Sequence, residues 1–272
     1  MTTGLSNPSA LDLDAYLRRV QYSGDLHPSY SVLAALHLAH ATHIPFENLD
    51  ILLGRPVRLD LESLQAKMVN GERGGYCFEQ NLLFAAVLER LGFSLTPLAG
   101  RVRYRARRVL PRTHMLLLVR CDGSTWVADV GFGLEGLLLP LPFGSRQEMR
   151  QHGRIYRIVP EQEQWTLQMF DAGSWSDLYT FSLDPQLLAD YEMASYYTST
   201  HPDSPFVRTL IVQLPTPEAR KVLRNLELTV DDGRSITSRT IEGDDELLEV
   251  LTRVFGLRFP SGTRFLFRDA VT

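Results

Sequence analysis

The chain has 272 residues, of which 44% are hydrophobic and 22% are charged, and its formal net charge is only -4. This composition is that of an ordinary globular protein, and it excludes a disordered or fibrous chain. Because the basic residues form no long run, it also excludes the charge pattern of a nucleic-acid-binding protein.

No apolar stretch approaches the ~18 residues that a membrane-spanning helix needs. The N-terminal sequence MTTGLSNPSALDLD lacks the basic start and apolar centre of a signal peptide. We therefore expect a cytoplasmic protein without a membrane partner. In that reducing compartment the 2 cysteines remain free thiols, so one of them can act as a nucleophile.

The chain falls into three parts by pattern. Apolar residues recur at helical spacing in four early segments, residues 11–22, 29–43, 61–69 and 77–93. From about residue 94, short β-rich runs alternate with turn residues and predict an antiparallel sheet or small barrel; these runs are 113–119, 124–130, 154–159, 164–170 and 175–181. The last part mixes strand-like runs (209–214, 226–230 and 235–241) with one helical segment, 244–257, and predicts an α/β subdomain.

Cys77 follows Gly74 and Gly75 and directly precedes the long helical segment, so it lies at or near a helix N-terminus. Unpaired backbone N–H groups and the helix dipole favour an anion there, which predicts a lowered pKa for the Cys77 thiol. The alternative is that Cys77 is a small apolar residue in a core helix. Cys121, in the turn-like CDGS, has no such setting and is expected to be structural.

A β-hairpin is predicted over residues 111–133, with Asp122 and Gly123 as its central turn residues. In this register Arg120 faces Thr125, Leu118 faces Val127, Leu116 faces Asp129 and His114 faces Gly131. Because side chains alternate along a strand, His114 and Asp129 then lie on the same face, close enough to hydrogen-bond. The hairpin therefore supplies a base and its orienting carboxylate for a thiol nucleophile, giving a Cys77, His114, Asp129 triad.

Two other clusters have less specific patterns. His37, His40 and His43 lack the further ligands of a metal site, so we expect core or capping roles and no metal. The basic run 101–108 is expected to be an exposed loop or hairpin tip, with contact to an anionic ligand such as a nucleotide phosphate as the alternative.

The segments RGGYCFEQN, RTHMLLLV and WVADVGFG resemble the catalytic blocks of arylamine N-acetyltransferases. HLAHATHIPFENLD and YYTSTHPDSPF are also similar to that family. The resemblance implies an α+β fold with a cysteine-protease-like Cys-His-Asp core. Its parts would be an N-terminal helical bundle (1–92), a central antiparallel β-barrel (93–200) and a C-terminal α/β lid (201–272).

The resemblance also implies an enzyme that uses acetyl-CoA as co-substrate and holds no permanent cofactor. Its acceptors would be small arylamines, hydrazines or N-hydroxyarylamines, acetylated by a ping-pong mechanism through Cys77. Gly131, Phe132 and Ser204 would lie in the pocket or near CoA. An ion pair of Glu47 with Arg73, joined by Arg19, would support the catalytic loop; the alternative is an ordinary ion pair that contributes little.

Two alternative enzyme classes use related chemistry. A transglutaminase-like thiol enzyme would act on peptide amides with the same three residue types. A macrolactam-forming amide synthase, a relative of the same fold, would act on a tethered polyketide chain. A binding module without activity is disfavoured because all three triad residues are present.

Overall fold

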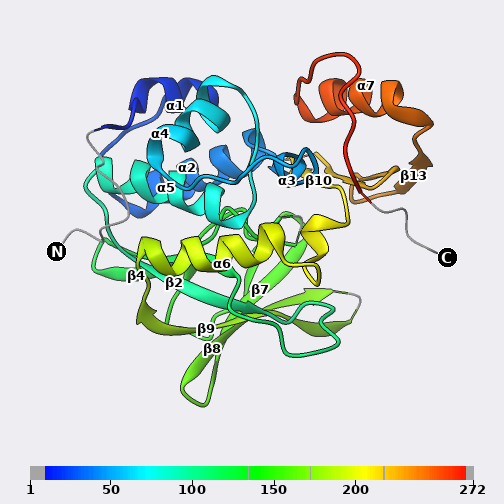
Figure 1. Cartoon of the computed structure of the whole chain (residues 1–272). Helices are drawn as coiled ribbons and strands as arrows, with labels where there is room; N and C mark the ends of the chain where they lie inside the picture. The colour runs from blue at the N-terminus through cyan, green and yellow to red at the C-terminus, as the bar shows by residue number, and fades with distance from the viewer. Residues whose placement is uncertain (1–9, 134, 172, 217, 268–272) are drawn as a thin grey trace.

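The structure, a computed structural model, describes residues 10–133, 135–171, 173–216 and 218–267. Figure 1 shows a group of helices from the first part of the chain beside a strongly curved β-sheet, with a smaller sheet and a helix at the C-terminal end. None of the helices in these described ranges is long and apolar enough to cross a membrane.

The early helical segments predicted from spacing are confirmed. The described helices of this part are α1 (Leu13–Arg19), α2 (Tyr30–His43), α3 (Leu49–Leu52), α4 (Leu61–Leu64), the π-helical turn η2 (Gln65–Asn70) and α5 (Cys77–Arg90). Side-chain caps begin three of them: Asp12 accepts from the backbone of Ala15, Ser29 from that of Val32 and Asp60 from that of Ser63. The segment 61–69 is helical as its spacing predicts, and it changes to π geometry after Leu64.

The middle of the chain forms a nearly closed antiparallel barrel. Its strands are β2 (Ser94–Val102), β3 (His114–Cys121), β4 (Ser124–Ala128), β5 (Leu141–Pro142), β6 (Met149–Gln151), β7 (Arg154–Glu161), β8 (Gln164–Asp171) and β9 (Ser174–Pro185). Their order is β5-β4-β3-β2-β9-β8-β7-β6. All five predicted strands of this region are present.

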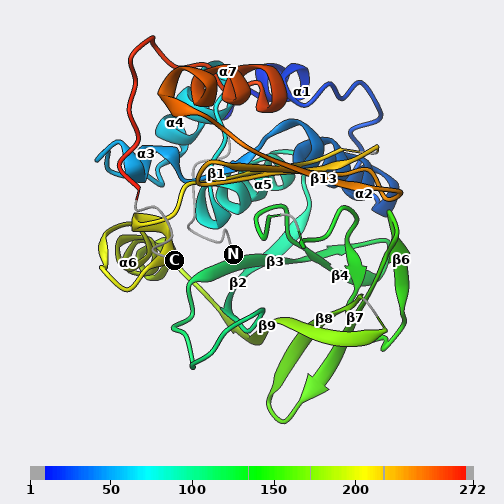
Figure 2. The ribbon, with the colours of Figure 1, turned by 90° about the vertical axis from the view of Figure 1, so that its right-hand side faces the viewer.

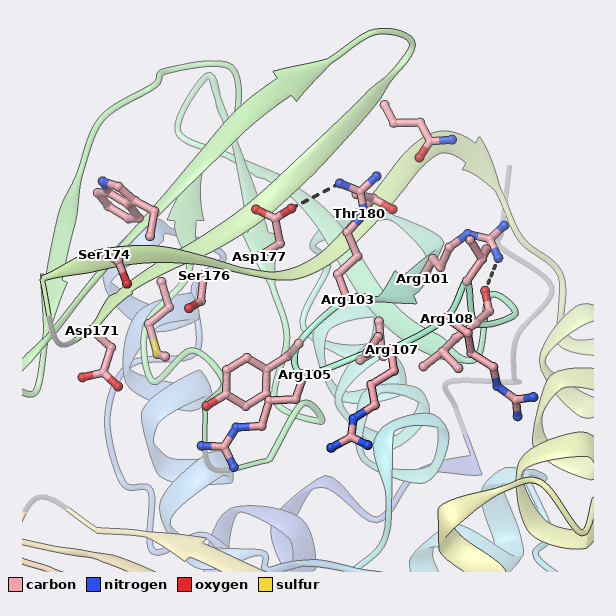
Figure 3. Close-up of a pocket in the computed structure, with 18 residues that line it drawn as sticks. Arg101, Arg103, Arg105, Arg107, Arg108, Asp171, Ser174, Ser176, Asp177 and Thr180 are labelled. Atoms are coloured by element: carbon pink, nitrogen blue, oxygen red, sulfur yellow. Dashed lines mark hydrogen bonds and ion pairs between the residues drawn. The ribbon is translucent and has the colours of Figure 1, made fainter.

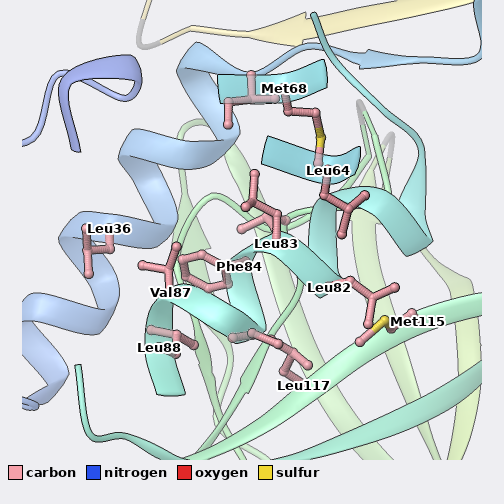
Figure 4. Packing of buried hydrophobic residues seen from close by; sticks show 14 of the residues in the cluster. Leu36, Leu64, Met68, Leu82, Leu83, Phe84, Val87, Leu88, Met115 and Leu117 are labelled. Atoms are coloured by element: carbon pink, nitrogen blue, oxygen red, sulfur yellow. The ribbon is translucent and has the colours of Figure 1, made fainter. Parts of the chain in front are cut away.

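Strand β3 is buried on both faces, which explains its continuous apolar sequence. Leu116 and Leu118 point into the barrel core, whereas Met115 and Leu117 join the core under the helices. Figure 4 shows α5 between α2 and β3, with Leu82 on the side of Met115. The strand that carries His114 is therefore packed directly against the helix that begins with Cys77.

The C-terminal part is a second antiparallel sheet covered by one helix (Figure 2). It contains β1 (Phe46–Glu47), β10 (Ile211–Pro215), β11 (Arg220–Arg224), β12 (Glu227–Asp231), β13 (Ile236–Thr240) and α7 (Gly243–Phe255). The helix ends at Phe255 and is capped by Gly256, whose φ of 72° is the left-handed conformation that glycine adopts without strain. Strand β1 comes from the helical part of the chain, and it pairs with β10 through Glu47 and Val212.

A helix that the sequence patterns do not predict lies between the barrel and the C-terminal sheet. Residues Leu188–Thr200 form helix α6, which is followed by the short helix η3 (Pro205–Val207). The sequence gives no apolar stripe for α6, because the residues that it buries are Tyr191, Ser195 and Thr198. The division of the chain at residues 92 and 200 remains a prediction.

Candidate active site

Cys77 is the first residue of α5, as the Gly-Gly-Tyr-Cys sequence predicts. The turn before it lies against β1, since Gly75 donates to the carbonyl of Pro45 and its own carbonyl accepts from Glu47. A Cβ at Gly74 would lie 2.0 Å from the Pro45 carbonyl oxygen. Only glycine therefore fits at position 74, and this close approach fixes where α5 and its cysteine begin.

The hairpin register is confirmed over the residues that pair. Arg120 faces Thr125 and Leu118 faces Val127. The ladder ends at Ala128, so the predicted pairings of Leu116 with Asp129 and of His114 with Gly131 do not form. His114 Nε2 nevertheless lies 2.7 Å from Asp129 Oδ2, in a buried site.

Asp129 accepts hydrogen bonds from several directions. Oδ2 is bonded to His114 and to the hydroxyl of Tyr179 at 2.9 Å. Oδ1 accepts from Asn81 Nδ2 at 3.0 Å and from the backbone of Gly131 at 2.9 Å. Burial raises the pKa of this carboxyl, but the adjacent His114 and the hydrogen bonds outweigh that effect and hold it below its ordinary value.

The Cys77 thiol lies next to the strand that carries the histidine. Its Sγ is 3.5 Å from the carbonyl oxygen of Thr113, the residue before His114. Burial, followed by the charge of Asp129, raises the pKa of the thiol, although the backbone N–H groups of Met115 and Phe78 act in the opposite direction. The lowered pKa predicted from the helix position alone is therefore wrong, because desolvation is the larger effect.

The three residues expected near CoA lie in different surroundings. A Cβ at Gly131 would come within 2.8 Å of Cys77 Cα, so this glycine permits a close approach to the thiol-bearing backbone. The ring of Phe132 meets that of His114 edge-on at 5.1 Å between centroids. Ser204 is buried at the start of η3, where its hydroxyl donates to the carbonyl of Thr198 and accepts from the backbone of Phe206.

A largely buried network of ion pairs lies beneath the Gly-Gly-Tyr-Cys turn. Arg73 binds Glu47 at 2.6 Å and Asp50 at 3.3 Å. Lys67 binds Asp50 at 2.8 Å and Glu79 at 2.7 Å, and Glu79 in turn accepts from the backbone of Tyr76. The network therefore supports the start of α5.

Arg19 joins this region through backbone carbonyls rather than through a carboxylate. Its guanidinium donates to the carbonyl oxygens of His43 at 2.7 Å and Met68 at 3.0 Å. It also reaches the carbonyls of Glu72 and Arg73, just before the glycine turn. These contacts tie α1 to α2, η2 and the segment that leads to Cys77.

His37 and His40 are buried and hydrogen-bonded within the core. His37 Nε2 accepts from the backbone of Asp129 at 3.0 Å, and its Nδ1 donates to the carbonyl of Leu138. His40 Nε2 lies 2.7 Å from Gln80 Oε1, and its Nδ1 lies 2.9 Å from the hydroxyl of Tyr16. His43 Nδ1 lies 2.8 Å from the carbonyl oxygen of Ala39, one turn earlier in α2.

The amide of Gln80 fixes the tautomer of His40. Because Gln80 Nε2 donates to the carbonyls of Pro45 and Gly75, its Oε1 accepts from His40 Nε2, and His40 Nδ1 accepts from Tyr16. This neutral chain of hydrogen bonds also ends at the glycine turn. Among residues 10–133, 135–171, 173–216 and 218–267, no three His, Cys, Asp or Glu side chains gather as a metal site.

Two residues that hydrogen-bond to Asp129, Asn81 and Tyr179, are not among the site residues predicted from the sequence. Asn81 lies one turn after Cys77 on α5. This i, i+4 spacing predicts that the two side chains lie on the same face of the helix. Tyr179 lies on β9 and is 50 residues from Asp129 along the chain. No local pattern marks that contact, because it depends on how the barrel curls.

The substitution Lys67→Met tests the buried network. It leaves Asp50 and Glu79 without their shared cation, so we expect a loss of about 3–5 kcal/mol in the free energy of unfolding, measured by urea titration. The matched control is Arg58→Met, which removes an exposed ion pair with Asp60 and should cost at most about 1 kcal/mol. Equal losses in the two variants would contradict the structural role of the network.

The buried histidines predict a loss of stability in acid. Burial lowers the pKa of His37 from its ordinary value of 6.5 to about 4 and that of His40 to about 3. Both are neutral above pH 6.5 whether folded or unfolded, so their contribution is complete there. As the pH falls below 6.5, the unfolded chain takes up protons first and the free energy of unfolding decreases.

The pH dependence is measured by urea titration between about pH 7.5 and 4.5, where the unfolded chain gains the proton. His40→Gln should flatten the profile relative to the unsubstituted protein. The exposed His27→Gln is the control and should leave the profile unchanged. A His40→Gln profile as steep as that of the unsubstituted protein would exclude His40 as a source of the acid sensitivity.

The proteins whose sequences are similar to this chain are N-acetyltransferases. A sequence model described as N-acetyltransferase matches residues 29–263. The arylamine N-acetyltransferase of Escherichia coli (strain K12) is 39% identical over 249 residues, 90% of this chain and 88% of that protein. The arylamine N-acetyltransferase / N-hydroxyarylamine O-acetyltransferase of Salmonella typhimurium is 36% identical over 90% of this chain and 88% of that protein.

Solved structures are similar over nearly the whole chain. The Nocardia farcinica arylamine N-acetyltransferase superposes with a TM-score of 0.87 at 39% identity, covering 94% of this chain and 93% of that one. The Mycobacterium marinum arylamine N-acetyltransferase in complex with CoA has a TM-score of 0.86 at 34% identity, covering 90% of this chain and 93% of that one. Sequence, fold and site geometry agree, and the chain belongs to the arylamine N-acetyltransferase family.

Proposed function

We propose that this protein transfers an acetyl group from acetyl-CoA to small arylamines, hydrazines or N-hydroxyarylamines through a thioester on Cys77. The bond between His114 Nε2 and Asp129 Oδ2, beside a cysteine at a helix N-terminus, carries the proposal. The names of the relatives and the CoA bound to the Mycobacterium marinum protein support the donor and acceptor classes.

In the first half-reaction the Cys77 proton passes to His114. The thiolate attacks the thioester carbonyl of acetyl-CoA, the carbon–sulfur bond to CoA breaks, and the proton leaves with CoA. Because burial raises the pKa of the thiol, a free thiolate is unfavourable, and the ionised sulfur needs an imidazolium beside it. Asp129 favours that imidazolium through the bond to Nε2, which leaves Nδ1 to accept the proton.

In the second half-reaction the amine nitrogen attacks the acetyl carbonyl on Cys77. His114 takes the amine proton, the bond between the acetyl carbon and the Cys77 sulfur breaks, and His114 returns the proton to that sulfur. The apolar ring of Phe132 beside His114 supports an aromatic acceptor and limits the access of water. Gly131 lets the segment after Asp129 pack directly against the Cys77 backbone, where a side chain would clash.

The first test is the mass of the intact protein after mixing with acetyl-CoA and no acceptor, followed by peptide mapping. We expect one acetyl group on Cys77 that disappears when an arylamine is added. Cys77→Ser should remain unmodified, whereas the control Cys121→Ser should be acetylated like the unsubstituted protein. An unmodified protein with an alkylatable Cys77 would instead point to the amide synthase or the peptide-directed thiol enzyme.

The second test concerns the carboxylate. Asp129→Asn places an N–H₂ group among four donors, so the amide cannot accept from all four of them as the carboxylate does. We expect the rate of Cys77 acetylation to fall by about 100- to 10,000-fold. Tyr179→Phe is the matched control, because it removes one donor but keeps the charge; a fall as large as that of Asp129→Asn would contradict the assigned role of the carboxylate.

A further inference from the structure

His37, on α2, contacts the backbone of Asp129 and so reaches the site from the side of the helices. Its side chain is fully buried, and its Nε2 accepts a hydrogen bond from the backbone N–H of Asp129 at 3.0 Å. Its Nδ1 donates to the carbonyl of Leu138 at 3.1 Å. One imidazole therefore holds both ends of the segment 129–138, which follows β4.

The contact with Asp129 lies at the point where a strand ends. β4 pairs with β3 as far as Ala128, which is opposite Leu117. The backbone N–H of Asp129 comes after this ladder, and in a buried site such a group is destabilising unless another acceptor replaces the strand. His37 Nε2 is that acceptor. The imidazole thus helps to set the direction in which the backbone of Asp129 leaves the sheet.

The two contacts fix the tautomer of His37. A backbone N–H only donates and a carbonyl only accepts, so Nε2 carries no proton and Nδ1 carries one. A protonated ring would point an N–H at the N–H of Asp129 and break that contact. Burial lowers the pKa of His37 to about 4 and outweighs the opposite effects of the Asp129 charge and the two backbone hydrogen bonds. The ring is therefore neutral, as the contact requires, at neutral pH.

The backbone of His114 is held in a different way. His114 is the first residue of β3 and pairs with Gly100 of β2. The connection before it continues the basic run 101–108 and is largely exposed, as the sequence predicts; Figure 3 shows its arginine side chains beside an open cleft on the outside of the barrel. Loss of the His37 contact therefore acts on Asp129 and leaves the strand pairing of His114 in place.

We propose that His37 is a positioning residue for the transfer reaction, because its acceptor nitrogen holds the backbone of Asp129 so that the carboxylate meets His114. This role rests on the proposed function, since it matters for acetyl transfer only if the triad ionises Cys77. His37 acts through Asp129 and takes no part in the proton transfers. A displacement of about 1 Å in such an arrangement costs on the order of 100-fold in rate.

Two substitutions separate the two contacts of the ring. The amide of glutamine lies as far along its side chain as Nε2, so His37→Gln can still accept from Asp129 but loses the donor to Leu138. The amide of asparagine lies as far along as Nδ1, so His37→Asn can still donate to Leu138 but leaves the N–H of Asp129 without its acceptor. Each variant removes one buried hydrogen bond, so their urea midpoints should be similar and each is the matched control for the other.

The rate of Cys77 acetylation by acetyl-CoA is followed by the mass of the rapidly quenched intact protein. His37→Gln should react within about threefold of the unsubstituted rate, whereas His37→Asn should be slower by about 10- to 100-fold. The difference should lie in the rate at saturating acetyl-CoA rather than in KM, because the substitution acts on the carboxylate. Equal losses in the two variants, a larger loss in His37→Gln or no loss in either would overturn the assignment.

Alkylation of Cys77 by iodoacetamide gives a second measurement that needs no acetyl-CoA. At about pH 7, His37→Asn should react more slowly than His37→Gln, because the thiolate then depends on the imidazolium that Asp129 stabilises. The difference should shrink as the pH rises, since a thiolate formed by hydroxide needs no imidazolium.

Faster alkylation of His37→Asn at every pH would show that the substitution only loosens the fold around Cys77, and it would exclude the positioning role. The two proposals can also fail separately. If the unsubstituted protein takes up no acetyl group while alkylation of the two variants differs as expected, the proposed acetyl transfer is wrong and the role of His37 in ionising Cys77 stands.

Discussion

The arrangement of the site depends on one buried negative charge. Asp129 is 1% exposed, and an ionised carboxylate taken out of water is strongly destabilising unless several donors replace the solvent. Those donors come from α5 through Asn81, from β3 through His114 and from β9 through Tyr179. Satisfying one carboxylate thus fixes the helix and the two barrel strands relative to one another.

The start of α5 is held by two chemically different supports. On one side are the ion pairs of Lys67 and Arg73, and on the other is the neutral chain from Tyr16 through His40 to Gln80. Both supports contact the turn before Cys77. The ion pairs reach it because Glu79 accepts from the backbone of Tyr76, and the neutral chain reaches it because Gln80 donates to the carbonyl of Gly75. This rigid frame matters because proton transfer between a thiol and an imidazole tolerates little error in position.

Local patterns predicted the elements that carry the proposed triad. Helical spacing and two glycines placed Cys77 at the start of α5, and a two-residue turn placed His114 near Asp129. Contacts that depend on the closure of the barrel had no such signal, as Tyr179 illustrates. Helix α6 has no apolar stripe because its buried face is largely polar, and the pKa of the Cys77 thiol is raised by burial, which helix position alone does not reveal.

Strand β1 has a consequence for the order in which the protein is completed. Phe46 and Glu47 pair with Gln213 and Val212, while the backbone of Glu47 also bonds to Gly75 in the turn before Cys77. During synthesis, which runs from the N-terminus, the helices emerge long before residues 211–215. The turn before Cys77 therefore leaves the ribosome while its neighbouring strand still lacks a partner, and the site is complete only after the last quarter of the chain has been synthesised.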